Sequence, residues 1–149
     1  MPEYPDAVDP TKVGSYPANS GAGGGLVWDE VLEYRVWCHP ERGAPDDDGS
    51  GEDYYYAFAT YTEALECSRD TPGAEQPLAL ILQREHINEP EPGRYVHITK
   101  ERTVEWPAEF LRRPKRQPST IPDFLSPDAP PNRLDILRGL DQPRHDTTE

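Results

Sequence analysis

The sequence lacks the features that mark membrane-spanning and secreted proteins. It contains no run of about 18 apolar residues, so no membrane-spanning helix is predicted. Its first residues contain no basic stretch followed by an apolar segment, so we expect no secretory signal and a cytoplasmic protein. Only two cysteines, Cys38 and Cys67, are present. In a reducing compartment we expect two free thiols, and whether they pair depends on their separation in the fold.

Apolar and basic residues are both scarce. Hydrophobic residues make up 34% of the 149 residues, below the roughly 45–50% apolar content of an ordinary globular domain, which predicts one small domain with flexible ends. Lys and Arg number 15 against 28 Asp and Glu, a formal net charge of −13. This charge repels phosphate backbones, so nucleic-acid binding is not expected, while a cationic partner or substrate is favoured. Simple solubility is the alternative explanation of the same charge.

Prolines and glycines, 18 and 11 in number, confine regular structure to the middle of the chain. Residues 1–25 contain several prolines and end in the linker-like run 21–25, which predicts a disordered N-terminal segment. Residues 113–149 form a proline-rich tail. Within this tail we predict an apolar island over 121–125 and a docking helix over 132–140, the latter from its stripe of leucines.

Residues 26–112 are predicted to form an α+β domain. Strands are expected over 28–38, where apolar and polar residues alternate, over 54–58, over 78–86, and over 95–106, the last as one long strand or two short ones. Between the second and third strands, Thr60 and Glu63 form the capping box of a helix that ends near Asp70. The order predicts a small four-stranded mixed sheet, ββαββ, with one main helix. The second and third strands would be parallel if paired, and the last two would form an antiparallel hairpin.

A single helix covers one face of such a sheet and leaves the other face short of cover. Either the tail returns to cover that face or a partner does. Three consecutive tyrosines, Tyr54, Tyr55 and Tyr56, present rings to both faces, so at least one ring is expected at a contact surface. The basic cluster over 112–116 is expected to make salt contacts within the chain or with a partner.

The motifs of metal and cofactor chemistry are incomplete in this sequence. Asp46–Gly51 matches the opening of a calcium-binding EF-hand loop, but the position that supplies its bidentate glutamate is Ala57. The residues of zinc-ligand type are Cys38, His39, Cys67, His86 and His97, and they lack the paired spacing of zinc sites. The glycines of 21–25 precede a strand instead of a helix, so they form no phosphate loop. We therefore expect no metal and no cofactor.

The stretch Tyr54–Ser68 (YYYAFATYTEALECS), followed by Pro77–Trp106, resembles a group of short bacterial proteins that are often labelled GNAT-type N-acetyltransferases. The resemblance covers roughly residues 33–112. That family holds the acetyl-CoA pyrophosphate with backbone donors of an R/Q-x-x-G-x-G/A segment between a strand and a helix. In this sequence Gln83 and Arg84 are not followed by the required glycines, so no acetyltransferase site residues are carried over.

These observations predict a small acidic protein-interaction or regulatory module without catalytic activity, which binds a protein partner. The candidate partner-binding residues are the three tyrosines and the apolar residues of the tail: Tyr54, Tyr55, Tyr56, Ile121, Phe124, Leu125, Leu134, Leu137 and Leu140. One alternative is a degenerate acetyltransferase relative or another small-molecule enzyme. Its first candidates for proton transfer are Glu85, His86, His97 and Tyr55. The other alternative is an acidic protein that mimics nucleic acid.

Overall fold

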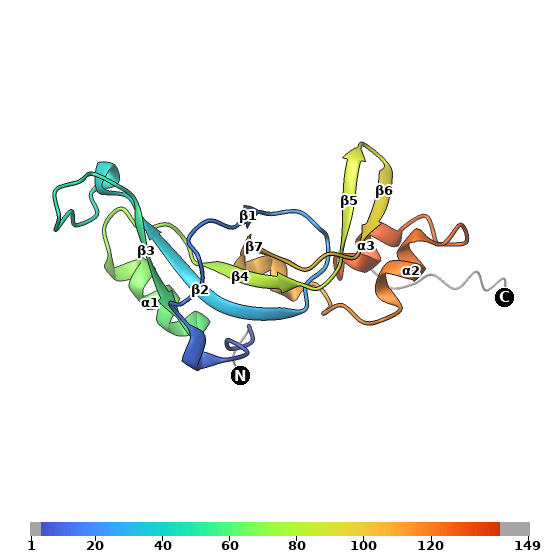
Figure 1. Ribbon diagram of the computed structural model, residues 1–149, viewed down its shortest axis with the longest axis horizontal. Coiled ribbons are helices and arrows are strands. Elements are labelled where there is room, and N and C mark those ends of the chain that lie inside the picture. The colour runs from blue at the N-terminus through green and yellow to red at the C-terminus, as the bar shows by residue number, and fades with distance from the viewer. Residues whose placement is uncertain (1–3, 141–149) are drawn as a thin grey trace.

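The computed structural model describes residues 4–140 (Figure 1), and the parts of our predictions that concern residues 1–3 and 141–149 lie outside this range. The strands are β1 (Gly21–Ala22), β2 (Glu30–Cys38), β3 (Tyr54–Phe58), β4 (Leu78–Gln83), β5 (His86–Glu91), β6 (Arg94–Ile98) and β7 (Arg102–Pro107). The helices are α1 (Tyr61–Asp70), α2 (Thr120–Leu125) and α3 (Arg133–Leu137), with 3-10 helices over Pro10–Lys12, Pro40–Arg42 and Ala108–Arg112. None of the described helices has the length and apolar character that a membrane span requires.

Five strands form the main sheet, in the order β1-β7-β4-β2-β3. β1 runs parallel to β7, and all other neighbours in this sheet are antiparallel. The predicted α+β class is confirmed, but the strand arrangement differs from the ββαββ sheet we expected. β2 lies between β3 and β4, so the two strands that flank α1 in the sequence do not pair. The reason is that β2 is long and almost wholly buried, and it pairs along both of its edges.

The chain between β4 and β7 forms a separate hairpin. β4 ends at Gln83, whose side-chain amide donates hydrogen bonds to the carbonyl oxygens of Gly24 and Val27 at 3.0 and 2.8 Å. β5 and β6 then form their own two-stranded sheet and stand away from the main sheet (Figure 1). An isolated bridge joins Ile87 of β5 to Gly25. The strand predicted over 78–86 therefore stops at Gln83. Of the two alternatives for residues 95–106, two short strands are found, β6 and β7.

Helix α1 covers one face of the main sheet. Its predicted cap residue is confirmed, because Thr60 Oγ1 accepts a hydrogen bond from the Glu63 backbone N–H at 3.2 Å. The Thr60 hydroxyl in turn donates to the Glu63 carboxylate at 2.9 Å. Ala64 is fully buried against the sheet, and the ring of Tyr61 meets that of Tyr34 edge-on, with centroids 5.9 Å apart. An isolated helix this short is marginal in water, so these contacts hold it in place.

Residues 14–18 of the N-terminal segment lie on the other face of the sheet, whereas composition predicts a disordered segment. Alternation along β2 places Glu33 and Arg35 on this face, and neither side chain is exposed to solvent. The carbonyl oxygens of Pro17 and Ala18 accept hydrogen bonds from the Arg35 guanidinium at 2.7 and 3.3 Å. A buried guanidinium needs acceptors for its N–H groups, so it orders a segment that has no apolar core of its own. This part of the face is therefore covered within the chain.

The sequence does not determine whether the tail packs on its own domain. In the structure the tail folds back onto the domain. Figure 1 shows α2 and α3 beside the β5–β6 hairpin. A second apolar cluster joins them, formed by Val27, Ile87, Ile121, Phe124 and Leu137. The ring of Tyr95 on β6 meets that of Phe124 edge-on, with centroids 4.9 Å apart. The helix predicted over 132–140 is the shorter α3, and it packs within this chain.

Both cysteines are free thiols in the structure. Cys38 is fully buried in the main core, where burial raises the pKa of its thiol. Cys67 is half-buried on α1 and packs against the same core. Cys38 is thus a small core residue, as its place in the alternating strand predicts.

Candidate functional site

The basic cluster at the start of the tail pairs with acidic residues of the domain. Arg116 Nε donates to Asp29 Oδ1 at 2.8 Å, and Arg116 Nη1 lies 3.3 Å from Glu85 Oε2. Lys115 Nζ lies 3.0 Å from Glu30 Oε1. The prediction of salt contacts within the chain is confirmed for Lys115 and Arg116, so this part of the cluster anchors the tail.

Two of the four candidate proton-transfer residues lie in contact. His97 Nε2 is 2.6 Å from Glu85 Oε1, and the second oxygen of that carboxylate faces Arg116. His86 is buried, and burial is the main cause that lowers the pKa of its imidazole. Tyr55 lies on β3, at the other end of the molecule (Figure 1). The Glu85–His97 pair therefore belongs to the anchor of the tail, and the structure does not bring the four residues into one site.

The three tyrosines of β3 differ in their surroundings. The Arg35 guanidinium carbon lies 4.5 Å from the centroid of the half-buried Tyr55 ring. The Tyr54 hydroxyl donates to the carbonyl oxygen of Pro45 at 2.7 Å. Tyr56 is 47% exposed, and its ring meets that of Tyr54 edge-on at 5.7 Å between centroids. Tyr56 is thus the one of the three that presents a large part of its ring to solvent.

The apolar tail residues predicted to bind a partner are mostly used inside the chain. Ile121, Phe124 and Leu137 are buried in the second cluster, and Leu125 and Leu134 pack against it. Leu140 is 72% exposed. The surface that the tail leaves accessible is a hollow between its two helices.

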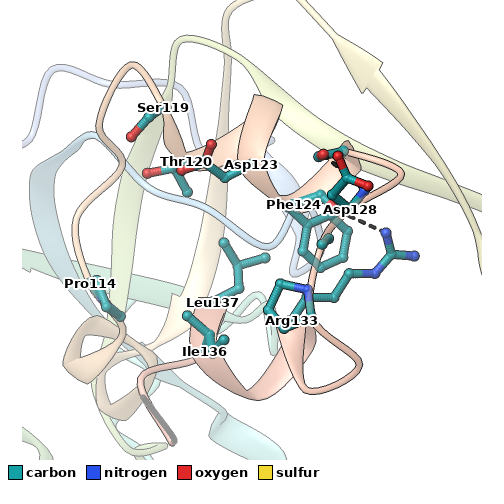
Figure 2. Close-up of a pocket in the computed structure, with 12 residues that line it drawn as sticks. Pro114, Ser119, Thr120, Asp123, Phe124, Asp128, Arg133, Ile136 and Leu137 are labelled. Atoms are coloured by element: carbon teal, nitrogen blue, oxygen red, sulfur yellow. Dashed lines mark hydrogen bonds between the residues drawn. The ribbon is translucent and has the colours of Figure 1, made fainter. Parts of the chain in front are cut away.

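This hollow, the α2–α3 groove, has a volume of about 430 Å³. It is lined by Pro114, Ser119, Thr120, Asp123, Phe124, Ser126, Asp128, Ala129, Pro130, Arg133, Ile136 and Leu137. Figure 2 shows Phe124 reaching in from α2, and Ile136 and Leu137 from α3. Most of the wall is apolar, and hydroxyl and carboxylate groups stand at its α2 side.

The charged groups of the α2–α3 groove are unequally engaged. Arg133 Nη1 donates to the carbonyl oxygen of Phe124 at 2.8 Å. Its guanidinium carbon also lies 4.7 Å from the ring centroid of Phe124 and 5.3 Å from that of Tyr95. Asp123 and Asp128 are exposed, and neither forms an ion pair with a Lys or Arg between residues 4 and 140. The rim of the groove therefore carries unneutralised negative charge.

A second hollow, about 280 Å³ in volume, lies in the loop between β2 and β3. Its wall consists of Pro45, Asp46, Asp47, Asp48, Ser50, Glu52, Asp53, Tyr54 and Tyr56. The carboxylates of the EF-hand-like opening bind the loop's own backbone: Asp46 accepts from the N–H of Gly51 at 3.2 Å, and Asp48 from that of Ser50 at 3.0 Å. These bonds from Ser50 hold the pKa of Asp48 below its usual value. The two aspartates thus stabilise a turn.

The part of the chain that the structure describes contains one group of at least three His, Cys, Asp or Glu residues able to share a metal ion: His39, Glu41 and Asp53. Their ligand atoms lie within 4.8 Å of one another. In the sequence, His39 stands out only together with the cysteines and the other histidines. Glu41 and Asp53 are not recognisable as its partners because a long loop separates them and no spacing motif joins them.

The carboxylates of the groove rim are not among the predicted site residues. Phe124 and Leu137, which line the groove, were predicted from their apolar patterns. Asp123 lies inside the apolar island and Asp128 follows it closely. A charged residue inside a short amphipathic helix faces away from the buried stripe, and this signal could have placed Asp123 at the rim.

Comparison of the chain with known protein families, with curated proteins and with solved structures finds no significant match.

Proposed function

We propose that this protein is an interaction module without catalytic activity, which binds a segment of a partner protein in the α2–α3 groove. The partner segment carries an apolar side chain next to a Lys or Arg. The observation that carries this proposal is the combination of an apolar floor with two unpaired carboxylates, Asp123 and Asp128, on the rim.

The floor of the groove suits one large apolar side chain. Phe124 and Leu137 are held by the second apolar cluster, so the groove exists before binding. A preformed groove reduces the ordering that association requires. Burying a side chain of the size of leucine or phenylalanine contributes about 1.5–3 kcal/mol, enough for a specific but reversible contact.

The charge of the protein favours a basic segment. The net charge of −13 attracts cations over the whole surface and raises their rate of encounter. At the groove itself, Arg133 is engaged with two rings and a carbonyl oxygen, so it leaves Asp123 and Asp128 free to pair with a partner. Charges at a rim contribute to specificity and to the association rate more than to affinity.

A display library of random peptides, selected on the full-length chain, tests the proposal. We expect enriched peptides that combine an apolar residue with neighbouring Lys or Arg. The doubly substituted variant Asp123→Asn/Asp128→Asn should bind them about tenfold more weakly. Asp47→Asn/Glu52→Gln is the matched control, because it removes the same charge from the exposed loop between β2 and β3.

Binding sites are then located by backbone amide shifts in NMR spectra of the chain with an enriched peptide. Shifts confined to residues 114–137 support the proposal. Enriched peptides without basic residues would contradict it. So would an equal loss of affinity in both double variants, or shifts that lie on the main sheet.

A further inference from the structure

A histidine and three carboxylates meet at the end of the molecule away from the α2–α3 groove. His39 follows β2, Glu41 lies in the 3-10 helix Pro40–Arg42, and Asp53 precedes β3. Glu75, in the connection between α1 and β4, faces the same imidazole ring. Figure 1 shows the loop between β2 and β3 at the opposite end from α2 and α3.

The backbone holds His39 and Glu75 in a fixed relation. The N–H of His39 donates to the carbonyl oxygen of Gly73 at 3.0 Å, and the N–H of Glu75 donates to that of Trp37 at 2.8 Å. Gly73 has φ +72°, and a Cβ on it would lie 2.5 Å from the backbone nitrogen of Ala44. Only glycine permits this close approach of the two chain segments. The imidazole is therefore positioned by the fold before any ligand binds.

The two ring nitrogens of His39 have different partners. Nε2 forms a short contact with Glu75 Oε2, which fixes the proton on Nε2 when the ring is neutral. Nδ1 then carries a lone pair. It lies 2.9 Å from Asp53 Oδ1, but this contact is not aligned as a hydrogen bond. Nδ1 is buried and has no hydrogen-bond partner within residues 4–140.

A lone pair close to an ionised carboxylate is repulsive unless a cation stands between them. The side chain of His39 is only 10% exposed, so water does not screen this repulsion well. Without a metal ion a proton on Nδ1 relieves it, because the carboxylates of Glu75 and Asp53 raise the pKa of His39. A metal ion shared by Nδ1 and Asp53 would displace that proton, and the third donor, Glu41, lies within reach of both.

The geometry points to a site for a divalent transition-metal ion such as Zn²⁺, with His39 Nδ1, Glu41 and Asp53 as ligands and Glu75 as the carboxylate that orients His39. Histidine ligands commonly donate their other ring N–H to a carboxylate, which fixes the tautomer. Imidazole and carboxylate are zinc ligands with bonds of about 2.0–2.2 Å, and three protein ligands leave a fourth position for water. Such bonds space neighbouring ligands about 3.4 Å apart.

The site needs only a small contraction to reach that spacing. Its donor atoms lie within 4.8 Å of one another, and Glu41 and Asp53 are exposed residues at the ends of a loop. Their side chains can therefore move while His39 and Glu75 stay in place. Four more carboxylates of the same loop, at Asp46, Asp47, Asp48 and Glu52, raise the local concentration of cations.

Calorimetric titration of the full-length, chelator-treated chain with ZnCl₂ tests the site. We expect saturable binding of one ion. His39→Gln removes a ligand and should abolish the binding. Glu41→Gln should weaken it at least tenfold, and Glu75→Gln about 10- to 100-fold, the usual effect of losing the carboxylate that orients a histidine ligand. Asp47→Asn, which removes one neighbouring charge but no ligand, should change the affinity less than about threefold.

Two further measurements keep the test decisive if His39→Gln fails to fold. Glu41 is exposed, so Glu41→Gln leaves the core intact, and its thermal unfolding without metal should match that of the parent. In imidazole NMR spectra, Zn²⁺ should shift the Nδ1 resonance of His39 but not those of His86 and His97. Absence of saturable binding would overturn the inference. So would full affinity in Glu41→Gln, or shifts at the other histidines alone.

Discussion

Arg35 and Glu33, which lie on the same face of β2, form an ion pair from which water is excluded. Arg35 Nε donates to Glu33 Oε2 at 2.7 Å, and neither side chain is exposed. Glu105 of β7 joins them, with its Oε2 3.0 Å from Arg35 Nη1. The same oxygen accepts a hydrogen bond from the Trp37 indole N–H at 2.9 Å. Two carboxylates and the carbonyl oxygens of the N-terminal segment thus surround one guanidinium.

Removing the guanidinium should leave two carboxylates without a counter-charge. We expect Arg35→Met, which keeps most of the side-chain volume, to lower the free energy of unfolding by about 3–5 kcal/mol. Urea denaturation followed by tryptophan fluorescence measures this. Arg84→Met is the control, because Arg84 is 51% exposed and its ion-pair contacts are 3.9 and 4.0 Å long. The Arg84→Met substitution should lower the free energy of unfolding by less than about 1 kcal/mol. Equal effects of the two variants would contradict the role of Arg35.

The first residues of the described chain are expected to unfold only with the sheet beneath them. Ala7 N–H donates to Ala59 O and Val8 N–H to Val31 O, both at 2.8 Å. The Tyr34 hydroxyl donates to the carbonyl oxygen of Pro5. Tyr34→Phe removes that donor and should cost about 1 kcal/mol. Hydrogen exchange at the amides of Ala7 and Val8 should become faster.

Tyr95→Phe provides the control for this exchange experiment. Tyr95 packs against Phe124 at the other end of the molecule, so its variant should leave the exchange of the Ala7 and Val8 amides unchanged. Exchange of these amides at the rate of an unstructured chain in the unsubstituted protein would show that the N-terminal segment does not rest on the sheet.

The places of the main elements were predictable because local signals specify them. Alternation marks β2, aromatic residues mark β3, and Thr60 with Glu63 marks the start of α1. The burial of Glu33 and Arg35 was not predictable in this way. Charged residues at alternate positions usually mean a solvated face, and only the fold shows that carbonyl groups from a distant segment solvate them instead.

The strand order and the candidate site depended on contacts between distant residues. Local sequence patterns do not predict that β2 lies between β3 and β4, because pairing along both edges of a strand depends on the whole sheet. The apolar stripes identified Phe124 and Leu137, but not that these residues would wall a groove together with Asp123 and Asp128. The three candidate metal ligands, His39, Glu41 and Asp53, likewise meet only after a long loop closes.

The attachment of the tail should depend on Arg116 more than on Lys115. Arg116 pairs with Asp29, which is 3% exposed, whereas Lys115 is 51% exposed. Arg116→Ala leaves the buried carboxylate with the Arg84 backbone N–H, at 2.7 Å, and the more distant Arg84 guanidinium, at 3.9 Å. This substitution should lower the free energy of unfolding by about 2–3 kcal/mol. Lys115→Ala should cost no more than about 1 kcal/mol. Urea denaturation of both variants gives the comparison, and equal costs would argue against Arg116 as the anchor.

Acidification should destabilise the protein through His86. The residue is 7% exposed, and Nδ1 has no hydrogen-bond partner in the described part of the chain. Burial, followed by the nearby charges of Arg102 and His97, lowers the pKa of this imidazole below 6.5 in the folded state. Between the two pKa values the unfolded chain binds more protons than the folded one, so stability rises with pH across this window. The contribution is present above pH 6.5 and is lost as the pH falls through the lower pKa of the folded state.

The pH range in which His86 changes the stability can be measured both by titrating the imidazole and by unfolding the protein. An NMR titration should give His86 a midpoint below 6.5, the ordinary value for the side chain. Urea denaturation at a series of pH values should show stability falling below that pH. His86→Leu, which has no proton to bind, should flatten this part of the profile while leaving the alkaline part unchanged in shape. A His86 midpoint at or above 6.5 would mean that water reaches the ring, and the hairpin β5–β6 would then pack less closely against residues 24–27 than the described contacts require.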